Sequence, residues 1–218
     1  GIAGIVHLDG APVDRDALDR MTDALTHRGP DGRGIFIDRN VGLGHRRLKI
    51  IDLSEAAAQP MVSSDQNAVI TFNGEIYNYR ELRPALLARG HVFASQSDTE
   101  VIVHLYEEYG ADCVQHLRGM FAFALWDAGR GCMILARDPF GIKPLYYAND
   151  GWTVRAASQV KALLESRSIS RVAEPAASAG FFLTGSVPEP FTLANGQLTS
   201  NGRLRRIAIL QRHRDLID

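Results

Sequence analysis

The sequence predicts an α+β fold in which antiparallel sheets carry helices on their outer sides. Three observations predict it: amphipathic helical segments in the first half, two hairpin patterns in the second half, and no regular strand–helix alternation of the kind that indicates a parallel sheet. The chain has 218 residues, of which 45% are hydrophobic and 22% are charged. This length and composition are typical of a folded domain with a substantial core.

The first part of the chain predicts a strand, a helix and two further short strands. Residues 2–8 form an apolar run. Residues 14–25 place their apolar side chains on one helical face, and Asp14 has the side chain of a helix cap. Apolar runs at 35–37 and 41–48 predict two more strands before a polar loop.

The middle of the chain predicts a strand followed by two helices. Residues 68–72 are a compact apolar strand. Residues 79–88 predict a helix that ends before Gly90, and its inward side chains are expected to be Leu82, Leu86 and Leu87. A second helix is predicted at 98–109 and ends before Gly110; Ser97 and Glu100 have the spacing of a capping box at its start.

Two hairpins are predicted after the helices. Residues 121–127 and 132–137 flank a turn, and residues 145–148 and 152–157 flank a second turn with the sequence Asn-Asp-Gly. From about residue 195 the pattern weakens, with Asn-Gly pairs and several arginines. The predicted elements therefore lie in the first three quarters of the chain.

Charge and hydropathy argue against several classes of function. The formal net charge is −1, so no overall field attracts nucleic acid or an anionic membrane. No apolar run approaches the length of a membrane helix, and no signal peptide is evident, so a cytoplasmic location is expected. The two cysteines, Cys113 and Cys132, and the seven histidines lack metal-ligand spacing, so no metal site is predicted.

Asn73-Gly74 admits two interpretations. Between two strand-like runs it is typical of a hairpin turn. Alternatively, a side-chain amide and a neighbouring backbone N–H on a tight turn can both stabilise one developing oxyanion. The longer string Asn73-Gly74-Glu75-Ile76-Tyr77-Asn78 favours the second interpretation, because a plain turn does not require it.

Two charged motifs also have alternative interpretations. Arg46 and Arg47 end a strand in the string His-Arg-Arg-Leu, and paired arginines there are usually solvated, above all Arg46. Asp98 lies in Ser-Asp-Thr-Glu, which helix capping alone would explain. The segments 27–32 and 137–145 are loops on local rules.

Together these motifs resemble those of the class II glutamine amidotransferases, a branch of the Ntn hydrolases. The resemblance rests on Gly1-Ile2-Ala3-Gly4, on the strings that contain Arg47, Asn73 and Asp98, and on 137–145. It runs from Gly1 to about Leu193 and is closest to the glutaminase domain of glutamine-hydrolysing asparagine synthetases.

The resemblance implies a fold and a set of site residues. The fold would be a four-layer αββα sandwich. Glutamine would be held by Arg47 at its α-carboxylate, by Asp98 and Glu75 at its α-ammonium group, and by Ile51. Asn73 and Gly74 would form the oxyanion hole. In the family a cysteine immediately before the Gly-Ile-Ala-Gly run is the nucleophile, and the chain's terminal amine is the general base; Gly1 is therefore the catalytic position nearest to that cysteine.

The resemblance also implies domains and partners. Residues 1–193 would be the amidotransferase domain and 194–218 a divergent tail or connector. No phosphate loop is present, so ATP and Mg²⁺ would belong to a synthetase domain outside this chain, and this chain would need no cofactor. The expected partners are glutamine and an ammonia-accepting synthetase domain or protein, with a homodimer left open. The alternative hypothesis is an inactive glutamine-binding module, because the printed sequence does not contain the cysteine.

Overall fold

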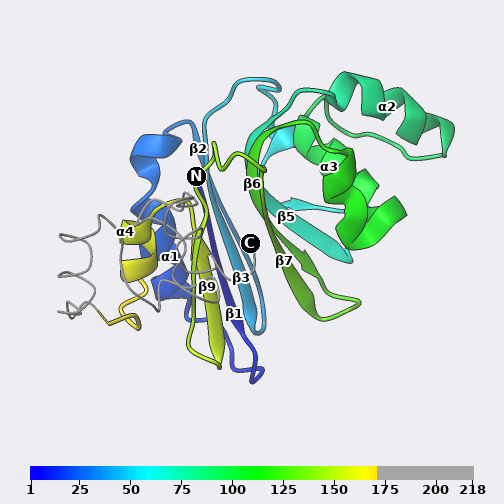
Figure 1. The fold of residues 1–218 in the computed structure, drawn as a ribbon. Helices are drawn as coiled ribbons and strands as arrows, with labels where there is room; N and C mark the ends of the chain where they lie inside the picture. Colours follow the sequence, from blue (N-terminus) through cyan, green and yellow to red (C-terminus); the bar gives the residue numbers. More distant parts are fainter. Residues whose placement is uncertain (171–218) are drawn as a thin grey trace, which may run out of the picture. The chain divides into compact units, whose positions relative to one another are not determined.

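The computed structural model describes residues 1–170, and the first of the chain's two compact units, Gly1–Ile169, lies within that range. This unit contains two antiparallel sheets with helices on their outer sides (Figure 1). It therefore confirms the predicted α+β class and the αββα arrangement that the resemblance implies. The predicted tail, 194–218, lies outside the described residues.

The first sheet has five strands in the order β2-β3-β1-β9-β8. Its central strand begins at the second residue of the chain, where the run Ile-Ala-Gly-Ile-Val is buried on both faces. In chain order the strands are β1 (Ile2–His7), β2 (Gly32–Asp38), β3 (Val41–Arg47), β8 (Tyr146–Asn149) and β9 (Thr153–Ala157). Because β1 pairs with both β3 and β9, the start of the chain lies between two strands rather than at an edge.

The second sheet has four strands in the order β4-β5-β6-β7. They are β4 (Met61–Val62), β5 (Ala68–Ile76), β6 (Gly119–Asp127) and β7 (Cys132–Arg137). β5 pairs with β6 along its whole length, whereas the two-residue β4 covers only Val69 and Ile70 on its other edge. Most of that edge of β5 is therefore available to side chains from other segments.

The helices cover the two outer faces. α1 (Arg15–Asp23) and α4 (Val160–Leu164) pack on the first sheet, α3 (Asp98–Tyr109) packs on the second, and α2 (Tyr79–Ala88) packs against α3. Three-residue 3-10 turns lie at Thr26–Arg28 and Glu55–Ala57, and a longer one at Gly110–His116. Apolar side chains fill three layers: beneath α1, between the sheets, and beneath α3.

Most predicted elements are confirmed with small changes at their ends. Asp14 caps α1 by accepting a hydrogen bond from the Asp16 N–H, and both hairpins are present. The prediction for Leu87 was wrong, because its side chain is 50% exposed whereas Leu86 is 2% exposed. α2 packs through a narrower face than its leucines suggest.

Two local predictions need correction. Asn73-Gly74 is not a turn: both residues lie inside β5, because β6 continues to pair with this strand as far as Ile76. The capping box at α3 is only half formed. Ser97 accepts from the Thr99 N–H, but Glu100 accepts from the N–H groups of Ala94 and Ser95 instead of returning to Ser97.

No helix within residues 1–170 is both long enough and apolar enough to cross a membrane.

Candidate functional site

A cavity of about 180 Å³ opens where β1, β3, β5 and the start of α3 come together. It brings together most of the predicted site residues, namely Gly1, Arg47, Ile51, Asn73, Gly74 and Asp98. Glu75 is not among the lining residues, although its charge acts on Asp98. Residues that are far apart in the sequence thus meet at one polar cavity.

Asn73 supplies an unused donor to this cavity. Its neighbour two residues earlier, Thr71, bonds to His45 of the first sheet, so this face of β5 looks toward that sheet. The side chain of Asn73 lies on the same face, because alternate residues of a strand share a face. Its amide nitrogen is buried and has no hydrogen-bond partner among residues 1–170. A buried donor without a partner costs free energy, so a ligand atom that accepts from it is favoured.

Gly74 offers a second donor from the backbone. On the edge of β5 that does not pair with β6, the Phe72 N–H donates to the side-chain oxygen of Gln59 at 2.6 Å, and the Ile76 N–H donates to Asp98 at 3.0 Å. Backbone N–H groups alternate between the two edges of a strand, so the Gly74 N–H points to this edge, between those two. A Cβ at Gly74 would lie 2.2 Å from the Met120 carbonyl oxygen, so only glycine fits here.

Arg47 ends β3 and orders the loop that follows it. Its guanidinium donates to the carbonyl oxygens of Ser54 at 2.9 Å and Asp52 at 2.6 Å. Arginine has five N–H donors, so several remain for a ligand in the cavity. The side chain is 8% exposed. A carboxylate that entered the cavity would therefore meet a guanidinium already held in place.

Asp98 places a buried carboxylate at the start of α3. Burial raises its pKa, and the nearby charge of Glu75 acts in the same direction, whereas the N–H groups of Ile76 and Thr99 oppose the shift. A raised carboxylate pKa means that the charged form lacks full compensation. A cationic group in the cavity would supply it.

The nitrogen of Gly1 lies at the same cavity and donates to the Arg46 carbonyl oxygen at 2.6 Å. Burial, with the charges of Arg28 and Lys143 acting in the same direction, lowers the pKa of an amine at this nitrogen from 8.0 to about 5. The field at the start of β1 is therefore positive. It favours unprotonated bases and anions.

His45 lies beneath the cavity and is 4% exposed. Burial holds its pKa well below its usual range, and the positive charge of Arg47 acts in the same direction. Its ring nitrogen Nδ1 lies 3.1 Å from the Thr71 hydroxyl oxygen. The ring is therefore neutral at pH 7 and connects the two sheets.

Arg46 corrects another prediction. Its side chain is only 15% exposed and pairs with Asp23 at the end of α1, so it is not simply solvated. The neighbouring loop, residues 27–32, contributes Arg28 to the cavity lining. In the sequence, only the His, Arg and Asp content of this loop indicated that it contributes to a site.

Sequence reasoning missed several further lining residues, among them Gln59 and Lys143. Gln59 bonds to Phe72 and, at 3.1 Å, to the Thr99 hydroxyl oxygen, so it joins β5 to α3. Nothing in its local sequence indicates this. Lys143 lies in the segment 137–145, which the sequence predicted as a structural loop.

Asp138 builds that loop. Its carboxylate is 3% exposed and accepts from four backbone N–H groups, those of Phe121, Phe140, Ile142 and Lys143. Arg137 closes the loop by donating to the carbonyl oxygens of Lys143 and Gly141. The loop is therefore rigid, and it holds Lys143 at the cavity.

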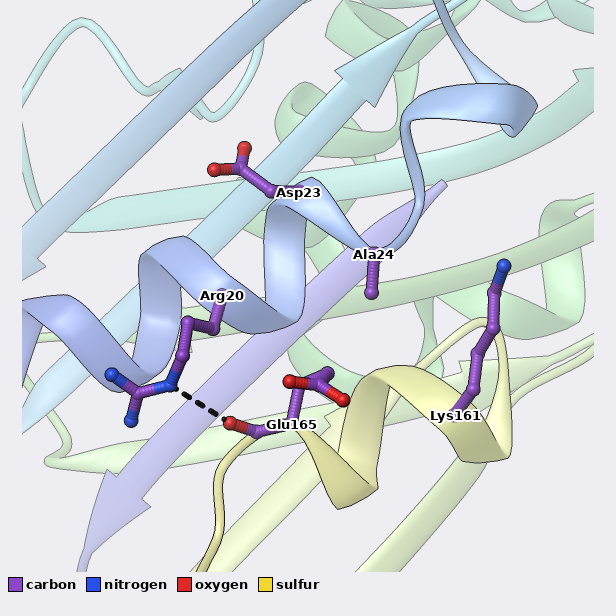
Figure 2. Close-up of a pocket in the computed structure, with 5 residues that line it drawn as sticks. All are labelled: Arg20, Asp23, Ala24, Lys161 and Glu165. Carbon is purple, nitrogen blue, oxygen red and sulfur yellow. Dashed lines mark hydrogen bonds between the residues drawn. The ribbon is translucent and has the colours of Figure 1, made fainter.

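A larger cavity, of about 390 Å³, lies between α1 and the end of α4 (Figure 2). It is lined by Arg20, Asp23, Ala24, Lys161 and Glu165. Arg20 crosses it to donate to the Glu165 carbonyl oxygen at 3.2 Å. Its charges are mixed, and no predicted site residue lines it, so we interpret it as a groove between two packed helices.

The two cysteines in the described residues do not resemble nucleophiles of the 180 Å³ cavity. Cys113 is fully buried, and burial raises the pKa of its thiol to about 11. Cys132 begins β7. Neither lines the cavity.

Comparisons with known proteins give a family match. Residues 1–207 match the family described as the glutamine amidotransferase domain. "Asparagine synthetase [glutamine-hydrolyzing] 3" of Bacillus subtilis is 43% identical over 167 residues, which cover 75% of this chain and 27% of that protein. "Putative asparagine synthetase [glutamine-hydrolyzing] 2" of Methanocaldococcus jannaschii is 37% identical over 213 residues, which cover 88% of this chain and 41% of that protein. The chain thus spans a minor part of these relatives.

A solved structure gives the same fold. The glutamine phosphoribosylpyrophosphate amidotransferase of B. subtilis superposes with a TM-score of 0.64 at 23% identity, covering 76% of this chain and 43% of that one. At this identity the likeness shows the fold alone. The family match over most of the sequence shows more: the chain belongs to the glutamine amidotransferase domain family and is akin to the N-terminal domain of the asparagine synthetases.

Proposed function

We propose that this domain binds free glutamine in the 180 Å³ cavity and hydrolyses its side-chain amide to glutamate and ammonia. One observation carries the proposal: the buried Asn73 amide nitrogen without a partner among the described residues, beside the edge of β5 that presents the Gly74 N–H. Two preorganised donors at one point suit the oxyanion of an acyl-transfer reaction.

The charged end of glutamine has matching groups. Arg47 presents guanidinium N–H groups for the α-carboxylate, and the fork of an arginine matches a carboxylate with two parallel bonds. Asp98 lacks a cation, which the α-ammonium group would supply. Ile51 lines the same cavity and would contact the methylene groups. We assign Glu75 a role through its charge, since it does not line the cavity.

The proposed reaction uses a cysteine immediately before Gly1 as nucleophile. The terminal amine of that cysteine takes the thiol proton, its sulfur forms a bond to the side-chain carbonyl carbon of glutamine, and the carbonyl oxygen becomes an oxyanion held by Asn73 and Gly74. The bond from carbon to nitrogen then breaks, and the nitrogen leaves as ammonia after it gains a proton from the general acid, the terminal ammonium of that cysteine. Water attacks the resulting thioester, which restores the thiol and releases glutamate.

The site suits a base and a thiolate. Positive charges from Arg28 and Lys143, together with burial, already lower the pKa of an amine at Gly1. We infer that the same charges favour the thiolate of a cysteine placed one residue earlier. No metal ion is needed for these steps, and we assign no cofactor to this domain.

We further propose that the ammonia is passed to an acceptor domain of the asparagine-synthetase type. Exposed apolar side chains project from the two loops beside the cavity: Leu48, Ile50, Leu53, Phe140 and Ile142. Phe140 is 86% exposed although its loop is rigid. Such patches mark interaction surfaces.

The glutaminase proposal is tested with two versions of the chain. One carries Cys directly before Gly1 with a free amino group, and the other carries Ala there. The Cys version should release glutamate from glutamine, and the Ala version should not. Glutamine binding by both versions without turnover by either would instead support the inactive binding module.

The acceptor proposal is tested in a full-length protein that contains both domains. Phe140→Ser should reduce glutamine-dependent product formation and leave formation from added ammonia unchanged. Equal loss of both activities would contradict a role for this surface in transfer.

A further inference from the structure

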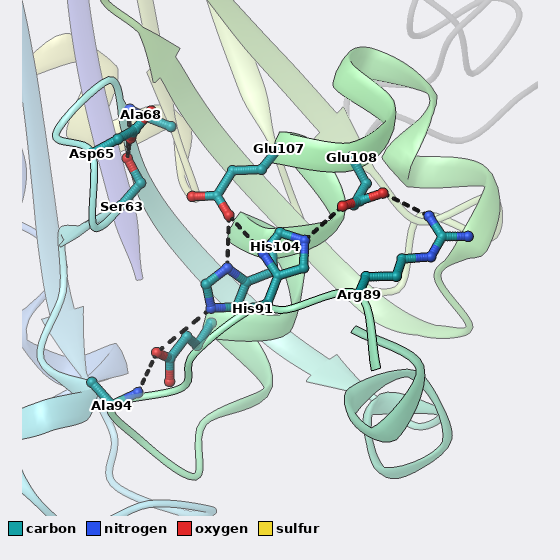
Figure 3. A network of polar contacts seen from close by, with 10 residues as sticks. Ser63, Asp65, Ala68, Arg89, His91, Ala94, His104, Glu107 and Glu108 are labelled. Atoms are coloured by element: carbon teal, nitrogen blue, oxygen red, sulfur yellow. Dashed lines mark hydrogen bonds and ion pairs between the residues drawn. The ribbon is translucent and has the colours of Figure 1, made fainter. Parts of the chain in front are cut away.

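Two histidines and three glutamates form a cluster that joins α3 to the segment after α2, and none of them lines the 180 Å³ cavity (Figure 3). His104 and Glu107 lie on α3, three residues apart, and therefore share one helix face. His91 follows Gly90, where α2 has ended and the chain turns with a φ of 95°. The fold thus joins histidines that have no metal-ligand spacing along the chain.

The ligand atoms are already close together. Glu107 Oε2 lies 2.7 Å from His104 Nδ1 and 3.1 Å from His91 Nδ1. One ligand atom from each of the three residues lies within 4.8 Å of the others. Ligand bonds of about 2.1 Å to a tetrahedral Zn²⁺ place neighbouring ligand atoms roughly 3.4 Å apart. Small rotations of the side chains would reach that arrangement.

Each ring also has a carboxylate at its opposite nitrogen. His91 Nε2 lies 2.8 Å from Glu108, and His104 Nε2 lies 3.8 Å from Glu100. Histidines that bind metals usually donate their second ring N–H to a carboxylate or carbonyl, which fixes the tautomer. His91 has that second partner in place at Glu108, whereas His104 Nε2 makes no hydrogen bond within residues 1–170.

Burial and charge also favour a bound metal ion at this cluster. The His104 side chain is 5% exposed, and its Nε2 is buried without a hydrogen-bond partner within residues 1–170. The cluster contains three carboxylates, and Arg89, which pairs with Glu108, is the guanidinium joined to it. The carboxylates outnumber this guanidinium, and a divalent cation would offset their charge.

We propose that His91, His104 and Glu107 bind a divalent transition-metal ion, for which Zn²⁺ is the representative. Two imidazoles favour zinc and its neighbours over Mg²⁺ and Ca²⁺, which prefer oxygen ligands. The Glu107 and His91 side chains are 23% and 14% exposed, so the ion can enter from solvent, and water completes its coordination. Glu108 orients the His91 ring.

The bound ion fastens the segment after α2 to α3. That segment continues through Ala94 and Ser95, which bond to Glu100, and through Gln96, which bonds to Asp52, to the cap of α3. Asp98 is six residues before His104, or about 9 Å along the helix axis. The proposed role of the ion is to stabilise this connection, independently of glutamine hydrolysis.

The test uses the full chain without an affinity tag, freed of metal by a chelator and titrated with ZnCl₂ against a chromophoric competitor. We expect one Zn²⁺ per chain. His91→Ala and His104→Ala should each weaken binding more than about tenfold, and Glu108→Gln by roughly 10- to 100-fold. His116→Ala, which alters an exposed histidine stacked on Tyr109, is the matched control and should bind normally.

Two measurements keep the test independent of folding. Circular dichroism and urea unfolding of the metal-free variants show whether each is folded, and His91, at the rim, is the variant least expected to disturb the core. Co²⁺ should give visible bands of nitrogen and oxygen ligation that disappear in His91→Ala. Equal Zn²⁺ affinity in folded His91→Ala and the parent chain, or a thiolate charge-transfer band with Co²⁺, would overturn the proposal.

Discussion

The side chain of Asn73 has a hydrogen-bond donor that a ligand could satisfy. Its amide nitrogen is buried, and no acceptor for it lies among the described residues. An oxyanion at that point would exist only on the reaction path, so the bond would lower the barrier without strengthening substrate binding.

Asn73→Ala should therefore lower kcat by about 10²- to 10³-fold and change KM little. Steady-state glutamate release by the chain with Cys before Gly1 measures both constants. Asn149→Ala, at the end of β8, is the control and should leave them unchanged. A raised KM at constant kcat would place Asn73 in ground-state binding instead.

His45 makes stability depend on pH in a defined direction. Burial depresses its pKa in the folded chain, whereas the unfolded chain takes up a proton near pH 6.5. Above pH 6.5 this difference leaves the free energy of unfolding at its full value. As the pH falls below 6.5, the free energy of unfolding decreases by about 1.4 kcal/mol per pH unit for one proton.

The comparison variant is His45→Gln, whose side chain can still bond to Thr71. Urea unfolding at pH 7.5 and 5.5 should show a smaller loss of stability in this variant than in the parent chain. Identical losses in the two proteins would mean that His45 is protonated in the folded state.

At the scale of an element, the loop 137–145 depends on one carboxylate. Burial alone would raise the pKa of Asp138, but bonds from the N–H groups of Ile142, Lys143, Phe121 and Phe140 outweigh burial and lower it. Removing this acceptor leaves several N–H groups without partners.

Asp138→Ala should cost about 3 kcal/mol in the free energy of unfolding. Urea denaturation measures this, with Asp112→Ala, an exposed residue of the turn after α3, as the control. Glutamine turnover should fall as well, because Lys143 would no longer be held at the cavity. A loss below about 0.5 kcal/mol, the range of ordinary surface substitutions, would contradict the role of Asp138.

Elements with strong periodicity could be predicted from sequence, and long-range polar contacts could not. The helix at 79–88 follows from its leucines and from Gly90, but the exposure of Leu87 depends on where α3 lies. Local rules read Asn73-Gly74 as a turn because they do not include β6, which extends β5 past both residues.

Polar residues with a role in the structure also fall into two groups, those that could be chosen from the sequence and those that could not. Arg47, Asn73 and Asp98 stand in recognisable strings, so they could be chosen from the sequence. Gln59 and His91 have no local signal, because their partners come from other elements. Their roles become visible only once the sheets and α3 are assembled.

At the scale of the whole molecule, ligand binding should stabilise the fold. L-glutamate, the expected product, carries the same α-carboxylate and α-ammonium groups as glutamine. A ligand at 100 times its Kd adds about 2.7 kcal/mol to the free energy of unfolding. For a chain of this size that corresponds to a rise in Tm of roughly 5–11 °C.

Arg47→Lys should remove most of this rise, because lysine keeps the charge but not the fork that matches a carboxylate. Thermal unfolding with and without L-glutamate measures it. Arg33→Lys, in a surface pair with Asp19 and Asp23, is the matched control. An equal rise in Tm for Arg47→Lys and the parent chain would place the amino acid elsewhere.

The short β4 has a consequence for solubility. An uncovered strand edge invites a strand of another molecule to add to the sheet, which is a common start of aggregation. Along β5, Gln59 and Asp98 occupy the positions of that edge on either side of Gly74 with side chains that cannot extend a sheet. The same two residues that shape the cavity therefore also discourage the chain from assembling edge to edge, and a variant that opened the cavity by trimming them would be expected to precipitate more readily.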